Sequence, residues 1–254
     1  MRVTDKPPVM IVVLYLKLGG LERMVIQLIK GLEEDGHKVT LVCIEEAGNL
    51  SHQLEGTHAD VHVLNKPPGF HINVAWQIAQ LARKNKISIV HSHNSAPHLY
   101  CAIAKILSAG TLKLIHTKHG RDDPDNKRLV FKNRLASMLS NKVVAVSRDA
   151  VDVCKDIESV NPGKLHFVPN GIDMSSFAEI PRQQQKERIQ QGNIRLVTVG
   201  RLSPEKNQQM MLHALKLIHA KHPQCTLTLC GDGNSRAELE ALASQLNIED
   251  RIQF

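Results

Sequence analysis

Arg201 and Lys206 are the first candidates for chemistry, because they follow directly on an apolar run, residues 194–199, that has the composition of a buried strand. Ligands of open α/β sheets bind beyond the carboxyl ends of the strands, which is where this order places both cations. A guanidinium and an ammonium at that edge can neutralise a diphosphate, and they stabilise most strongly the charge that grows on a departing diphosphate. The alternative is that both are solvated surface cations.

Two pairs of glycines also follow predicted strands. Gly19 and Gly20 lie between the first apolar run and the first helical segment, where backbone amides and a helix N-terminus can approach an anion closely. Gly231 and Gly233 follow residues 226–230, in a loop that could approach a nucleotide. Neither pair forms a GxGxxG or Walker motif, so an ordinary strand-to-helix turn is the alternative for both.

Five histidines gather near the ends of two further predicted strands: His91, His93, His98, His116 and His119. A strand end suits a histidine that holds substrate hydroxyls near a reacting centre. His91 lies inside its predicted strand, where a hydrogen-bonded place in the core is the preferred interpretation. A zinc site is the alternative for the group, but no cysteine or carboxylate cluster completes metal-ligand spacing, so no metal is expected.

The elements that must position these residues alternate along the chain. Short β-rich apolar runs are separated by helical stretches; they occur at residues 9–15, 39–44, 61–64, 87–91, 112–116, 143–146 and 165–168. Such alternation predicts an α/β fold, with a parallel sheet and crossover helices. Residues 21–34 carry apolar side chains at the 3.6-residue period, and Gly36 follows at the usual position of a helix C-cap.

A polar segment at residues 181–188 indicates a boundary between two domains, residues 1–178 and 179–254. The second domain is predicted to contain strands at 194–199 and 226–230 and helices at 207–222 and 235–246, with Ser235 and Glu238 as a capping box. Residues 252–254 have the pattern of a third strand opening. Since a doubly wound domain usually needs ~100 to 150 residues, we expect the second one to be incomplete.

Composition limits the classes of function. Hydrophobic residues make up 42% and charged residues 22%, as in a soluble globular protein. An aromatic share of 3% and the lack of a recognised motif argue against nucleic-acid binding, while the formal charge of +7 favours acidic partners such as nucleotide diphosphates or phospholipids. Five scattered cysteines without a CxxC pair fit a reducing cytosol, and no apolar run approaches the ~20 residues of a membrane span.

Several segments, in their order along the chain, resemble one known family. They are GGLER at 19–23, HSHN at 91–94, HTKHG at 116–120, AVS at 145–147, VPNGID at 168–173, VGRLSPEKN at 199–207 and CGDGNSRAELE at 230–240. Together they are similar to family 4 glycosyltransferases, whose two Rossmann-like domains form the GT-B fold. The resemblance implies an N-terminal Rossmann-like domain that binds the acceptor and a partial second one that binds a nucleotide sugar.

The resemblance also assigns roles around the donor. Arg201 and Lys206 match the family's pair on the donor diphosphate. Gly19 and Gly20 match the loop that faces this diphosphate.

Further positions match residues around the transferred sugar and the nucleoside. His119 matches the family's histidine beside the transferred sugar. Gly231 and Gly233 match the loop near the nucleoside. His93 and Asn94 fall on the acceptor side.

The implied activity is transfer of a hexose from a nucleotide-diphosphate sugar to a glycan or lipid-linked acceptor, with retention of configuration and without a metal or other cofactor. This is the chemistry of cell-surface polysaccharide or lipopolysaccharide biosynthesis, at the cytoplasmic membrane face in peripheral contact with anionic lipid. One departure stands out, because the family's later pair of glutamates, eight residues apart, has no counterpart before Phe254. A fragment that acts as a catalytically inactive binding module is therefore the second hypothesis.

Overall fold

The computed structural model describes residues 6–120, 125–172 and 194–254. The chain divides into two compact units, residues 1–173 and 174–254. The predicted boundary between residues 178 and 179, together with the polar segment that suggested it, lies outside the described residues. Each unit is built on a parallel sheet, which confirms the predicted fold class.

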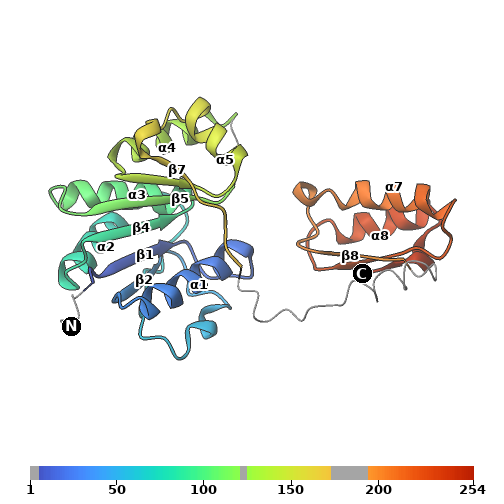
Figure 1. Cartoon of the computed structure of the whole chain (residues 1–254), viewed down its shortest axis with the longest axis horizontal. Coiled ribbons are helices and arrows are strands. Elements are labelled where there is room, and N and C mark those ends of the chain that lie inside the picture. Colours follow the sequence, from blue (N-terminus) through green and yellow to red (C-terminus); the bar gives the residue numbers. More distant parts are fainter. Residues whose placement is uncertain (1–5, 121–124, 173–193) are drawn as a thin grey trace. The chain divides into compact units, whose positions relative to one another are not determined.

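The first unit is a doubly wound sheet of seven parallel strands in the order β3-β2-β1-β4-β5-β6-β7 (Figure 1). The strands are β1 (Val9–Val13), β2 (Val39–Cys43), β3 (Asp60–Val63), β4 (Ile89–His93), β5 (Lys113–Lys118), β6 (Lys142–Ala145) and β7 (Leu165–Phe167). The order changes direction between β1 and β4. The carboxyl ends of the two strands at such a switch point are the usual ligand position of these folds.

Crossover helices join these strands: α1 (Gly20–Glu34), α2 (Ile72–Lys84), α3 (Ser95–Leu107), α4 (Lys127–Leu139) and α5 (Arg148–Asp152). Shorter helical turns are η1 (Ser51–Leu54), the π-helical η2 (Val153–Ile157) and η3 (Pro162–Lys164). Gly36 has a φ of +88° just after α1, which confirms its predicted place at the helix end.

Strand β1 is buried on both faces and separates two hydrophobic cores. Met10 and Val12 pack with α2, α3 and the inner side of α4, whereas Ile11 and Val13 pack with α1. Successive side chains of a strand point to opposite faces, so an uninterrupted apolar run becomes the centre of a three-layer sandwich. The carboxyl end of β1 is therefore held by a strand that is buried along its whole length.

Strand β4 lies two residues later in the sequence than predicted, because it spans Ile89–His93 instead of residues 87–91. Lys86 has a φ of +53°, and the amide of Ile87 donates to the carbonyl of Ala82 at 2.8 Å. This is the 6→1 bond of a Schellman motif, so Ile87 completes the end of α2. The shift brings His93 to the last position of β4.

The second unit contains a three-stranded parallel sheet in the order β10-β9-β8, with strands β8 (Arg195–Val199), β9 (Thr226–Cys230) and β10 (Ile252–Gln253). Its helices are α7 (Gln208–His219), α8 (Arg236–Gln245), and the short turns η4 (Pro204–Lys206) and η5 (Glu249–Arg251). Both α7 and α8 cover one face of this sheet (Figure 1). The predicted third strand is confirmed by the parallel pairing of β10 with β9.

The predicted capping box at the start of α8 is wrong. Ser235 is the N-cap residue, but its backbone is already helical and its side chain makes no capping bond. Glu238 instead accepts a hydrogen bond from the Gln209 side chain of α7 at 2.6 Å. The reciprocal bonds of a capping box need an extended N-cap backbone, and the contact between the two helices takes the glutamate.

Candidate functional site

The carboxyl edge of the large sheet carries the predicted residues of the first unit. Gly19 and Gly20 precede or open α1 after β1, His93 ends β4 and Asn94 follows it, and His119 follows β5. Because β1, β4 and β5 are neighbours, these residues lie at one edge, around the switch point.

His93 and His119 form a hydrogen-bonded pair between adjacent strand ends. Nδ1 of His93 lies 2.8 Å from Nε2 of His119, so one ring donates and the other accepts. His91 lies behind them, with its Nε2 2.7 Å from the hydroxyl of Thr117 and its ring 4.3 Å from that of His93. His91 thus has the hydrogen-bonded place that the sequence suggested.

Two nitrogens of the pair, Nε2 of His93 and Nδ1 of His119, are buried and have no hydrogen-bond partner in the described structure. Burial lowers the pKa of His119 to about 4, and burial with the neighbouring histidines lowers that of His93 well below its ordinary value. Both rings are therefore neutral at pH 7. Since buried polar atoms rarely lack partners, the pair has hydrogen-bonding capacity to offer a ligand or water.

His98 and His116 are core residues and not part of this pair. Their rings stack 3.7 Å apart with an angle of 2° between their planes. Nε2 of His98 lies 2.8 Å from the Ser140 hydroxyl, and Nδ1 of His116 lies 3.1 Å from that of Ser92. The five histidines thus divide into a group at the strand ends and a stacked pair in the interior.

A buried ion pair that the sequence analysis missed fixes the end of β5. Lys118 Nζ lies 2.6 Å from Oε1 of Glu158, both side chains are 4% exposed, and Asn133 Nδ2 donates to the same oxygen at 2.7 Å. Lys118 immediately precedes His119. A lysine inside a buried strand was the available signal, because such a charge needs a partner.

We expect the histidines to make the first unit sensitive to mild acid. Burial lowers the pKa of His91 from its ordinary value of 6.5 to about 4, with a smaller contribution from His119. In the unfolded chain a histidine ring takes up its proton near pH 6.5, whereas in the folded chain the buried ring does so only near pH 4. The free energy of unfolding is therefore fully present above pH 6.5 and falls as the pH drops toward 4. For one such histidine, the loss is about 2 kcal/mol by pH 5.

Urea unfolding at pH 7.5 and pH 5, followed by the fluorescence of Trp76, the single tryptophan, tests this expectation. His119→Asn should reduce the pH dependence, while His58→Gln, a change at an exposed histidine of the same unit, should retain it. An unfolding midpoint that stays constant from pH 7.5 to 5 would contradict the assignment.

The two glycines at the start of α1 differ in their surroundings, because a Cβ on Gly19 would collide with the side-chain carboxylate of Glu22, whereas Gly20 leaves open space. Gly19 is the extended N-cap residue, and the amide of Arg23 donates to its carbonyl. A Cβ placed on Gly20 would meet no atom within 4 Å. Nothing within the described unit therefore requires a glycine at that position.

In the second unit, Arg201 and Lys206 lie at the carboxyl edge of the small sheet, as predicted. Both side chains are exposed, and η4 holds Lys206 on its single turn. The pKa of Glu205 lies below its ordinary value, because the Ser203 side chain hydrogen-bonds to it and the charges of Arg201 and Lys206 lie nearby. The two cations thus share one local electrostatic environment.

Close packing explains why glycine is needed at positions 231 and 233, which the sequence did not reveal. A Cβ on Gly231 would collide with the carbonyl of Gly200, and one on Gly233 with the carbonyl of Leu202. The amide of Leu202 donates to the carbonyl of Asp232 at 3.0 Å. The glycines let the loop after β9 pack directly on the loop that carries Arg201.

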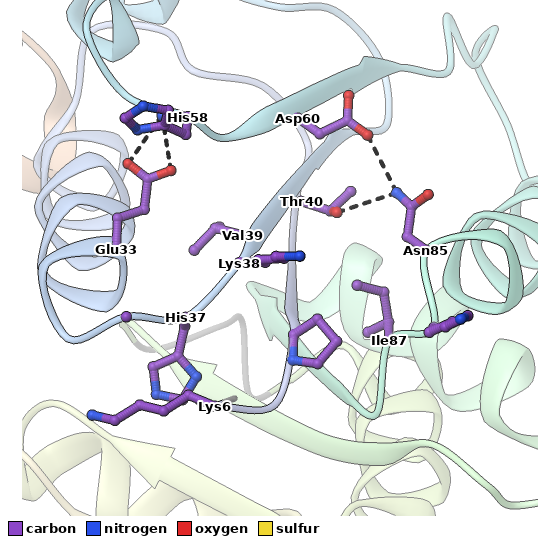
Figure 2. A pocket seen from close by; sticks show the side chains of 13 residues that line it. Lys6, Glu33, His37, Lys38, Val39, Thr40, His58, Asp60, Asn85 and Ile87 are labelled. Carbon is purple, nitrogen blue, oxygen red and sulfur yellow. Dashed lines mark hydrogen bonds between the residues drawn. The ribbon is translucent and has the colours of Figure 1, made fainter. Parts of the chain in front are cut away.

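A pocket of about 870 Å³ lies at the opposite, amino edge of the large sheet (Figure 2). It is lined by the first residues of β2 and β3 and by the end of α2. Asn85 spans it by donating to the Thr40 hydroxyl at 3.3 Å and to Asp60 at 3.2 Å. The His58 amide also donates to Glu33 at 3.0 Å, and the pocket lies away from the strand ends that carry the candidate residues.

Within the described ranges, no three histidine, cysteine or acidic side chains converge as a metal site. The five cysteines are free, with Cys230 exposed and the others buried. Among the helices of the described residues, none is both long enough and apolar enough to cross a bilayer.

Family models match nearly the whole chain. The model described as Glycosyltransferase Family 4 matches residues 18–176, and that described as Glycosyl transferases group 1 matches residues 179–254.

Relatives of established activity are similar along the chain. One is the UDP-Gal:alpha-D-GlcNAc-diphosphoundecaprenol alpha-1,3-galactosyltransferase of Escherichia coli, 27% identical over 92% of this chain and 65% of the relative. Another is the N-acetyl-alpha-D-glucosaminyl L-malate synthase of Bacillus anthracis, 26% identical over 94% of this chain and 65% of the relative. The chain thus spans slightly less than two thirds of the length of either.

Among solved structures, Anabaena HepE in complex with UDP has a TM-score of 0.76 and 23% identity, and the match covers 97% of this chain and 68% of that one. This likeness shows the fold.

Proposed function

The chain belongs to glycosyltransferase family 4, and on this premise we propose that it takes part in transferring a sugar from a nucleotide-diphosphate sugar to a glycan or lipid-linked acceptor. The observation that carries the proposal is the exposed pair Arg201 and Lys206 at the carboxyl edge of the small sheet, beside a loop held by two obligatory glycines. The name of the Escherichia coli relative specifies a UDP-sugar donor and a lipid-diphosphate acceptor, which favours the same classes here.

In the proposed reaction, the bond between the anomeric carbon and the diphosphate oxygen breaks, and the acceptor oxygen bonds to that carbon. The acceptor's proton leaves with the nucleoside diphosphate or to solvent. Charge grows on the leaving diphosphate, where Arg201 and Lys206 stabilise it more strongly than in the ground state. We also assign the backbone of Gly19 and Gly20 to the donor diphosphate, a proposal supported by the open space at Gly20 beside the start of α1.

We assign His119 to the transferred sugar. Its low pKa keeps the ring neutral, so it serves as a hydrogen-bonding group for sugar hydroxyls and not as a cation. His93 fixes the orientation of this ring through their hydrogen bond, and we assign His93 and Asn94, the N-cap residue of α3, to the acceptor side. Gly231 and Gly233 belong to the proposed nucleoside side.

The finer features of the proposal follow the family. Transfer would proceed with retention, without a metal or other cofactor, in cell-surface polysaccharide or lipopolysaccharide-type biosynthesis. The chain would work in the cytoplasm as a peripheral protein on the anionic membrane face, to which its formal charge of +7 is attracted.

Calorimetric titration of the chain with UDP, GDP and ADP, each beside its nucleoside, tests the donor site. We expect one nucleoside diphosphate to bind in preference to the others, and to bind more tightly than its nucleoside because the diphosphate carries the charge. No binding by a folded chain would overturn the proposal for this chain. Binding without sugar transfer to any lipid-linked or glycan acceptor would assign it to the inactive binding class.

A further inference from the structure

Helix α4 presents three of its large apolar side chains to solvent and two small polar ones to the core. Phe131, Leu135 and Met138 are 61%, 44% and 65% exposed. Asn133 and Ser137 are buried on the other side of the helix. Exposing three large side chains costs hydrophobic free energy, so this arrangement indicates a surface that is covered in use.

The exposed side chains form one stripe along the helix. At about 100° per residue, Met138, Phe131 and Leu135 fall within an arc of roughly 60°. Met138 lies seven residues after Phe131, so the stripe extends over roughly 10 Å of the helix axis.

Cations border this stripe on both sides. Lys127 and Arg134 flank it on one side, and Arg128 and Lys132 flank it on the other. All four are exposed, and none has a hydrogen bond or ion pair within the described residues. The helix contains no aspartate or glutamate.

We propose that this face of α4 docks the chain on an anionic lipid bilayer. A narrow apolar stripe with cations on both sides is what a helix lying in the membrane interface requires, because the stripe enters the acyl boundary while the cations meet the headgroups. A protein partner would need acidic groups along both borders of a single exposed helix. The four uncompensated charges match an anionic headgroup layer directly.

The position of α4 connects this surface with the site. The helix begins eight residues after His119, since Lys127 opens it, and its N-terminus follows the carboxyl end of β5. A lipid-linked acceptor would then reach the strand ends from the bilayer on which α4 lies. This consequence rests on the proposed function, whereas the docking surface itself rests on α4 alone.

Sedimentation of the full chain with vesicles tests the surface. We expect binding to vesicles of phosphatidylcholine with phosphatidylglycerol, weak binding to phosphatidylcholine alone, and weaker binding at higher salt. Phe131→Ser with Leu135→Ser should reduce the partition coefficient at least ~10-fold. Lys132→Gln with Arg134→Gln should reduce it about 30-fold on the anionic vesicles and leave phosphatidylcholine binding unchanged.

Matched controls lie on α7 of the other unit and just after it. Met210→Ser with Leu217→Ser removes two exposed apolar side chains, and Lys216→Gln with Lys221→Gln removes two exposed charges. Both controls should bind vesicles as the wild-type chain does. Because the α4 positions are exposed, circular dichroism should show unchanged folding of the α4 variants.

The outcomes separate this surface from the donor site. Absence of vesicle binding, or equal binding by wild type and α4 variants, would overturn the surface. A different result would be a wild-type dimer in light scattering that the α4 substitutions dissociate. That result would overturn the membrane surface and make this face of α4 the contact with a second copy of the chain. Nucleoside diphosphate binding, measured on the same variants, should be unaffected, so its absence would count against the donor site alone.

Discussion

In a titration with its preferred nucleoside diphosphate, Arg201→Ala should weaken binding by the chain about 10- to 100-fold, and Lys206→Ala should weaken it by a similar factor. A hydrogen bond to a charged group contributes about 1.5 to 3 kcal/mol, and both cations follow β8 without any element of the described unit covering them. The loss of affinity should be larger for the nucleoside diphosphate than for the nucleoside monophosphate, because the monophosphate has fewer charged oxygens for the two cations to neutralise.

Lys216→Ala is the matched control for this measurement. Lys216 is an exposed cation on α7 of the same unit, and its removal changes the net charge equally. If all three variants lose affinity to the same small extent, the effect is one of net charge, and the assignment of Arg201 and Lys206 to the diphosphate is wrong. If Lys216→Ala alone retains affinity, the two residues act through direct contact.

Separately, Lys118→Met or Glu158→Gln should destabilise the first unit by about 3 to 5 kcal/mol, the usual cost of leaving one charge of a buried pair without its partner. The pair is 4% exposed on both sides, and Asn133 also donates to the Glu158 carboxylate. The double change Lys118→Met with Glu158→Met should cost less than the sum of the single changes, because no buried charge remains.

Trp76 lies on α2, so its fluorescence during urea unfolding reports the first unit. The control is Lys17→Met, which removes an exposed cation 2.5 Å from Glu46 and should leave the midpoint unchanged. A loss for Lys118→Met no larger than that of the control would show that the buried pair does not hold the end of β5. Because Lys118 precedes His119, the variants should also lower the affinity for any ligand that this histidine binds.

Both experiments address groups that the sequence located with different success. Arg201 and Lys206 were found because a strand pattern and the residues after it are local, and the carboxyl end of a parallel strand has a fixed meaning. Glu158 was missed because it stands 40 positions from Lys118 and follows the short helical turn η2, where no strand-end motif marks it. Only packing brings such residues together.

The sequence by itself determined the alternation of strands and helices, the doubly wound sheet, and the placement of His119, Arg201 and Lys206 after strands. These features depend on the period of apolar residues and on the order of elements, which are properties of the linear chain. It erred at Ser235, where an expected capping bond lost to a contact between α7 and α8.

Tertiary structure alone decided how these residues meet. It joined His93 to His119 across two strands, packed Gly231 against Gly200, and turned Phe131 of α4 outward. The physical reason is that strand pairing and layer packing fix distances between residues far apart in the sequence, and burial then sets which charges and protons they keep.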